Sequence, residues 1–133
     1  MFARPFFTLL SVVVLLAIPV QAMAERVALV IGMGAYQHVV QLKNTINDAN
    51  NIAKKLEEIG FKVTLANDKS QAELLDIMQS FSFQAETADL ALVYYAGHGV
   101  EVAGINYLVP VDAQVKVATD IVRVGVPLSR VGP

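Results

Sequence analysis

Apolar and polar positions divide this chain into strands and helices that alternate. Continuous apolar runs at 26–31 and 90–95 predict strands buried on both faces, as in a parallel sheet. An alternating run at 61–65 predicts another strand. Apolar residues at three- and four-residue steps predict a helix over 46–59 and a second one after Ser70. The resulting order is that of an α/β fold with parallel strands and right-handed crossovers.

The ends of the two helices carry local signals. Ser70 and Glu73 have the spacing of a capping box. Gly60 suits the left-handed position that ends the first helix. Asp48 falls in the first turn of that helix, where a carboxylate stabilises the positive end of the helix dipole.

The last third of the chain has weaker patterns. Residues 100–102 and 106–109 predict a small hairpin around Ala103 and Gly104. Residues 121–124 predict another short strand. The stretch 126–131 has the pattern of a helix entry.

The N-terminus has the pattern of a secretory signal. Phe6 to Val20 is uncharged and almost wholly apolar, and Ala22 and Ala24 provide the small residues of a cleavage site. We therefore expect residues 1–24 to be a signal peptide and residues 25–133 to form an exported domain, periplasmic or secreted. An uncleaved membrane anchor is the alternative, but the run is shorter than the roughly 20 residues of a spanning helix. No stable membrane span is expected after cleavage.

Charge and composition limit the possible ligands. The net charge is −2 and there is no run of lysine or arginine, so no nucleic-acid partner is expected. The chain has no cysteine, which excludes disulfides and thiolate metal sites. Two histidines without a spaced third ligand make a metal site improbable. A dinucleotide fingerprint at Gly32 and Gly34 lacks its third glycine, so no cofactor is expected.

His98, between Gly97 and Gly99, follows a predicted strand directly. Ligands of open α/β sheets bind beyond the carboxyl ends of the strands. A neutral imidazole can accept and donate protons, and a backbone N–H beside it can stabilise an oxyanion. The segment thus has a general base and an oxyanion donor for acyl transfer, but it has no nucleophile. A glycine-rich turn with a surface histidine is the simpler alternative.

Five stretches in order make the chain resemble the caspase-like cysteine peptidases of clan CD (peptidase C14, p20 domain), in particular the bacterial metacaspase-like members. The resemblance covers about 26–112 and implies a mainly parallel three-layer α/β/α sheet and cysteine-type endopeptidase activity on a polypeptide substrate. The stretches are "RVALVIGMGAY" (26–36), "LKNTINDAN" (42–50), "LEEIGFKVTLAND" (56–68), "ADLALVYYAGHGV" (88–100) and "NYLVPVDA" (106–113).

The resemblance also implies roles for three residues. His98 matches the catalytic histidine, and Gly97 matches the glycine whose N–H contributes to the oxyanion hole. Asp48 matches the aspartate that lines the S1 pocket and selects arginine or lysine at P1. Without the resemblance, Asp48 could equally serve only the helix N-terminus.

The chain departs from the family in its missing nucleophile. Only 35 residues follow His98, none of them cysteine, whereas the family cysteine comes about 50 residues after the histidine. Ser129 is the nearest hydroxyl by chain order, but nothing in the sequence places it at His98. We therefore expect a p20-like domain truncated on its C-terminal side and inactive alone.

Two further hypotheses follow from that departure. Missing strands would leave an apolar sheet edge that a C-terminal half or a partner chain covers. The chain is then a partial peptidase domain, or a non-catalytic module that binds basic peptides or a partner. A nucleotide-binding α/β domain is the least favoured reading.

Overall fold

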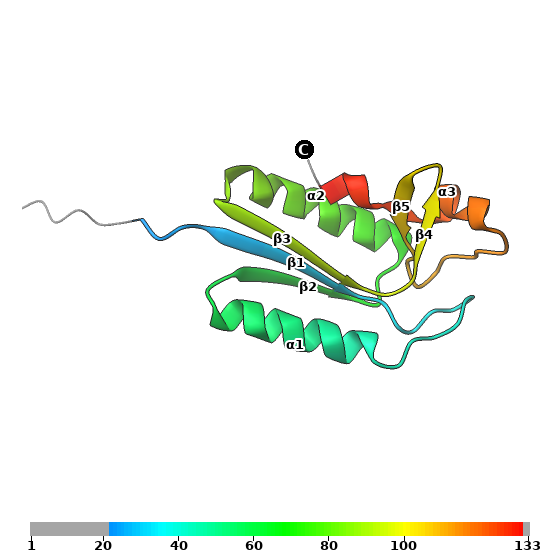
Figure 1. The fold of residues 1–133 in the computed structure, drawn as a ribbon, viewed down its shortest axis with the longest axis horizontal. Helices are drawn as coiled ribbons and strands as arrows, with labels where there is room; N and C mark the ends of the chain where they lie inside the picture. The colour runs from blue at the N-terminus through cyan, green and yellow to red at the C-terminus, as the bar shows by residue number, and fades with distance from the viewer. Residues whose placement is uncertain (1–21, 132–133) are drawn as a thin grey trace, which may run out of the picture.

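A parallel sheet forms the centre of the computed structural model, which describes residues 22–131. Strands β1 (Arg26–Gly32), β2 (Lys62–Asn67) and β3 (Leu90–Ala96) pair in parallel in the order β2-β1-β3 (Figure 1). The three predicted strands are confirmed. The expected signal segment lies almost wholly outside the described residues.

Two helices cover opposite faces of this sheet. Helix α1 (Thr45–Glu58) lies on one face and α2 (Gln71–Thr87) on the other (Figure 1). The buried side chains of β1 alternate between two clusters. Ala28 and Val30 pack toward α1, whereas Leu29 and Ile31 join the larger cluster that includes α2. The expected three-layer α/β/α class is therefore confirmed.

The helix signals named in the sequence are realised in the structure. Ser70 and Glu73 form the reciprocal capping box, with both hydrogen bonds at 3.2 Å. Gly60 has a φ of +92°, the left-handed conformation expected after α1. At the start of α1, the cap residue Asn44 makes no side-chain capping bond, and Asp48 lies in the first turn as expected.

A second, antiparallel sheet lies beyond the carboxyl end of β3 (Figure 1). Strands β4 (Gly99–Val102) and β5 (Ile105–Leu108) form the predicted hairpin, and β5 also pairs with β6 (Val126–Pro127). The two turn residues of the hairpin have φ values of +51° and +77°, as a tight primed turn requires.

Two expectations for the last residues are wrong. The segment expected as a strand at 121–124 is a single helical turn, α3 (Ile121–Val124), preceded by the 3-10 turn η1 (Ala118–Asp120). Ile121 is fully buried and Val124 half-buried, so this spacing presents one helical side to the core. The expected helix entry at 126–131 is β6 followed by the 3-10 turn η2 (Leu128–Val131).

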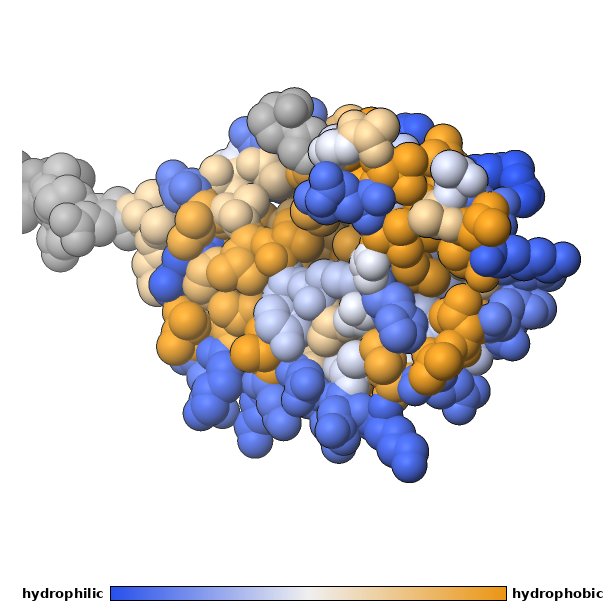
Figure 2. Space-filling model, turned by 45° about the vertical axis from the view of Figure 1, so that its right-hand side comes forward, coloured by the Kyte–Doolittle hydropathy of each residue, from blue (hydrophilic) through white to orange (hydrophobic). Residues whose placement is uncertain are grey.

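The face of the described part shown in Figure 2 has polar and apolar areas. In Figure 2 the lower side, where Figure 1 places α1, is blue, and orange areas lie above it. Within residues 22–131, β3 pairs with β1 only, so its other edge is open. Leu90 and Val93 on this strand are 49% and 37% exposed. No helix of the described residues is both long and apolar enough to span a bilayer.

Candidate functional site

His98 lies where β3 leaves the sheet, and its ring packs against the loop that follows β1. Its Nε2 atom is 2.7 Å from the carbonyl oxygen of Val40. The imidazole also packs on the ring of Tyr36, with 4.8 Å between ring centroids and 45° between ring planes. The side chain is thus held from two sides while remaining partly exposed.

The backbone of His98 is held by two tyrosines. The Tyr36 hydroxyl accepts the His98 N–H at 2.8 Å, and the Tyr95 hydroxyl donates to the His98 carbonyl. The two hydroxyls are 3.4 Å apart. Since Tyr95 uses its proton on the carbonyl, Tyr36 donates to Tyr95. Burial raises the pKa of both phenols, so both remain protonated and keep this chain of hydrogen bonds intact.

Sequence reasoning missed this role of the tyrosines and placed Tyr95 only within the strand predicted at 90–95. Tyr36 is 2% exposed although it lies in a loop, and a buried phenol needs a hydrogen-bond partner. Only the tertiary structure shows that the partner is the backbone on either side of His98.

Asp68 fixes the start of the loop that carries Tyr36. Its carboxylate accepts the N–H groups of Gly34 and Ala35, at 2.8 and 3.0 Å. Asp68 follows β2 directly and has a φ of +50°, a conformation that aspartate adopts more readily than most residues. The segments that follow the three parallel strands therefore meet at this edge of the sheet. Tyr36 comes after β1, Asp68 after β2 and His98 after β3.

The two glycines around His98 have different surroundings. A Cβ atom on Gly97 would lie 2.5 Å from the Tyr95 hydroxyl and 2.7 Å from the Tyr36 hydroxyl. A Cβ on Gly99 would meet only the Tyr107 carbonyl, at 3.7 Å. Gly97 thus permits the close approach of both tyrosines, whereas Gly99 is open to solvent.

The direction of the Gly99 N–H follows from the hairpin register. Gly99 is opposite Leu108 in the β4–β5 pair, and the Val109 N–H donates to the His98 carbonyl at 3.1 Å. Hydrogen-bonded and non-hydrogen-bonded pairs alternate in an antiparallel ladder. The Gly99 N–H therefore points away from β5, on the unpaired side of β4.

A shallow apolar pocket of about 240 Å³ lies beside the imidazole. His98 is the only titratable residue in its lining; the others are Val39, Val40, Gly99, Val100, Val109 and Val115. Apolar walls with one polar group are typical of sites that bind small molecules or side chains.

Asp48 lies in the first turn of α1 and is exposed. The loop from β1 leads into this turn, and Thr45 ties the helix start to the loop through a 2.8 Å hydrogen bond to the Met33 carbonyl. His98 and Asp48 therefore share the C-terminal edge of the sheet, and the structure shows no direct contact between them. The cap residue Asn44 makes no side-chain capping bond, and Asp48 is the acidic residue of the first turn, where a carboxylate stabilises the positive end of the helix dipole.

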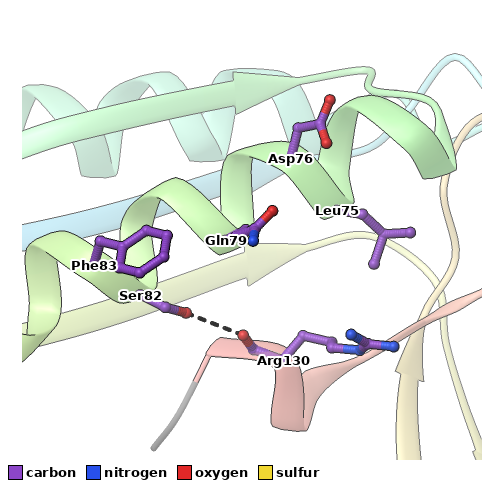
Figure 3. A pocket seen from close by; sticks show the side chains of 6 residues that line it. All are labelled: Leu75, Asp76, Gln79, Ser82, Phe83 and Arg130. Carbon is purple, nitrogen blue, oxygen red and sulfur yellow. Dashed lines mark hydrogen bonds between the residues drawn. The ribbon is translucent and has the colours of Figure 1, made fainter.

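Other candidates lie elsewhere. Ser129 lines a separate pocket with residues of the β4–β5 turn and not the pocket of His98. The pocket between α2 and η2 in Figure 3 is closed on one side by a 3.1 Å bond from Ser82 to the Arg130 carbonyl, and it contains no nucleophile next to a base. Among residues 22–131, no three histidine or acidic side chains lie close enough to hold a metal.

Comparison with known proteins shows which family the chain belongs to. The sequence profile of the Caspase domain family matches residues 25–125. The chain belongs to the caspase domain family. The match includes β1, α1 and β3, and with them every residue considered above for the site around His98.

Individual relatives agree with this assignment. The chain is 34% identical over 89 residues to mucosa-associated lymphoid tissue lymphoma translocation protein 1 of Homo sapiens and to its Mus musculus homologue. The aligned part is 67% of this chain but only 11% of each relative. A crystal structure of protein GSU0716 from Geobacter sulfurreducens shares the fold, with a TM-score of 0.59 at 20% identity, over 80% of this chain and 42% of that one.

Proposed function

We propose that this caspase domain is part of an exported cysteine-type endopeptidase in which His98 transfers the proton and Asp48 binds an arginine or lysine side chain at P1. The observation that carries the proposal is the position of the imidazole, with one ring nitrogen fixed by the Val40 carbonyl and an apolar pocket beside it.

The hydrogen bond to Val40 sets the tautomer of His98. A carbonyl oxygen can only accept, so Nε2 carries the proton and Nδ1 keeps its lone pair. Nδ1 can then take the proton of a thiol and later pass it to the leaving amine, while the carbonyl holds the ring in place. In catalytic triads, a hydrogen-bond acceptor likewise holds the ring nitrogen of the histidine that does not face the nucleophile.

For the oxyanion donor, the geometry favours the N–H of Gly99, whereas the resemblance implied that of Gly97. The Cα of Gly97 faces the two tyrosine hydroxyls, whereas Gly99 is open and its N–H points away from the hairpin. A donor must be free and face the developing charge. We therefore assign this role to the Gly99 N–H and a packing role to Gly97.

The nucleophile must come from outside these 133 residues, because they contain no cysteine. The open edge of β3 is the place where a further strand would continue the sheet. Such a strand would bring its C-terminal end to the edge that carries His98. The chain by itself is therefore expected to bind a substrate and not to cleave it.

Asp48 gives the proposed site its specificity. It is an exposed carboxylate in the first turn of α1, at the edge of the sheet that also carries His98. A carboxylate there would pair with a guanidinium by charge-assisted, bidentate hydrogen bonds. This supports a preference for basic residues at P1.

The test uses the exported chain and fluorescent peptides that end in arginine or in aspartate. We expect binding of the arginine peptide, no turnover, and at least a tenfold loss of affinity in Asp48→Asn. Glu57→Gln, on the exposed face of the same helix, is the matched control and should bind normally. Turnover that His98→Ala abolishes would contradict the proposed need for an external cysteine, and equal binding of both peptides would contradict the role of Asp48.

A non-catalytic module that binds a partner chain is the second candidate. The open β3 edge and a cavity of about 590 Å³ beside it, lined by residues of α2, β3 and η2, favour this function. Adding a polypeptide that carries the remaining strands of the domain distinguishes the two. Turnover on mixing supports the peptidase, whereas a stable complex without turnover supports the module.

A further inference from the structure

Glu25, the residue before β1, is held at the start of β3. Its backbone nitrogen lies 2.6 Å from a carboxylate oxygen of Asp89. In return its carbonyl accepts the N–H of Asp89 at 2.8 Å and that of Leu90 at 3.3 Å. Three hydrogen bonds thus join the beginnings of two neighbouring strands around this one residue.

The nitrogen of Glu25 is also the atom that the expected signal cleavage would release. Residues 22–24 are exposed and have no secondary structure, and Met23 is 90% exposed. Hydrolysis of the bond between Ala24 and Glu25 puts the hydroxyl of water on the Ala24 carbonyl and leaves an amine on Glu25. At neutral pH that amine takes up a proton and becomes an ammonium.

We infer that processing after Ala24 creates an ion pair between the new α-ammonium of Glu25 and the carboxylate of Asp89. Before cleavage this contact is a hydrogen bond from a neutral amide. After cleavage the nitrogen carries a charge as well, so a Coulombic attraction between opposite charges is added to a hydrogen bond that the ionised carboxylate already strengthens. The exported chain is then more stable than its precursor at the junction of β1 with the edge strand β3.

No cation of the described residues competes for Asp89. The described ion pairs join Lys55 with Glu58 and Lys69 with Glu73. The neighbouring Arg26 turns toward the other side, with its guanidinium over the Phe61 ring at 5.2 Å. Asp89 is therefore free to pair with a new N-terminus. This inference rests on the expected cleavage site and not on the proposed peptidase function.

The experiment uses the full chain, expressed in a bacterium that exports it. Mass spectrometry of the recovered product should give Glu25 as the first residue. The α-amine is then acetylated selectively near pH 6.5, where most lysines are protonated and unreactive. Thermal unfolding is compared before and after acetylation in the wild type, in Asp89→Asn and in the matched control Asp76→Asn, which removes an exposed carboxylate of α2.

Acetylation should lower the melting temperature by about 2–5 °C in the wild type and the control, as expected for an exposed ion pair, and by less than half of that in Asp89→Asn. Equal shifts in all three chains, or an N-terminus other than Glu25, would overturn the inference. Asp89→Glu keeps a carboxylate and should retain a clear acetylation effect.

A second measurement needs no variant. The α-amine of the folded wild-type chain should react with the acetylating reagent at least threefold more slowly than in urea. Equal rates would contradict an ion pair at this position.

Discussion

Replacing Gly97 by alanine tests the packing around His98 most sharply, because Gly99→Ala is a matched control two residues away. Neither glycine has a positive φ, so alanine is compatible with both backbones. The two differ in space. The added methyl group would lie 2.5 and 2.7 Å from the tyrosine hydroxyls at Gly97, against a single ordinary contact of 3.7 Å at Gly99.

The expected magnitudes follow from these distances. Carbon atoms do not approach hydroxyl oxygens to 2.7 Å or less without displacement, so both tyrosines must move. Overpacking of this kind costs about 1–3 kcal/mol, and weakening the two hydrogen bonds to the His98 backbone costs about 1 kcal/mol more. Gly97→Ala should therefore destabilise the domain by about 2–4 kcal/mol. Gly99→Ala should change its stability by less than about 1 kcal/mol.

Urea unfolding of both variants and the wild type measures this difference in unfolding free energy. The dependence of that free energy on urea concentration should be the same in all three proteins if the folded and unfolded states keep their compactness. The two histidines of the chain provide a second readout by NMR. Gly97→Ala should shift the ring signals of His98 and leave those of the exposed His38 in place. Similar stabilities for the two variants, within about 0.5 kcal/mol, would refute the reasoning.

Three further substitutions test other parts of the structure. Tyr36→Phe leaves the His98 N–H without its acceptor and should cost about 1–3 kcal/mol in urea unfolding. Ser70→Ala removes the cap of α2 and should cost about 1 kcal/mol. Hydrogen bonds from the side chain and then the backbone of Ser70 hold the pKa of Glu73 below its ordinary value of 4.5. The stability that this carboxylate contributes is therefore present above pH 4.5 and is lost as the pH falls through the lower pKa of the folded state. The difference in unfolding free energy between wild type and Ser70→Ala should shrink over the same pH range. Leu29→Ala, at a fully buried position of β1, should cost about 2–5 kcal/mol, and a loss under 1 kcal/mol would contradict its place in the core.

The elements that could be predicted have periodic patterns or local signals. The apolar run of β1 reflects burial on both faces of the sheet, and the three- and four-residue steps of α1 reflect burial of one helix face. Burial of this kind is set mainly by the side chains themselves. The capping box of Ser70 and the left-handed Gly60 depend on residues within one turn. Strands that alternate with helices in this way form a parallel sheet covered by helices.

The last segments were mispredicted because their structure depends on distant partners. Val126 is a strand residue through its pairing with Leu108 of the hairpin, 18 positions earlier, and nothing near it in the sequence specifies that pair. Three of residues 121–124 are β-branched, and the segment was expected to form a strand. The packing of Ile121 in the core instead favours one helical turn.

The sequence by itself determined the α/β layering, the caspase family and the presence of a histidine between two glycines at the C-terminal edge of the sheet, since each depends on local pattern or on order along the chain. Only the tertiary structure decided what holds that histidine. The Val40 carbonyl, the hydroxyls of Tyr36 and Tyr95 and the loop anchored by Asp68 come from segments far apart in the chain. Hydrogen bonds of this kind depend on distance and direction in space, which a linear pattern does not encode.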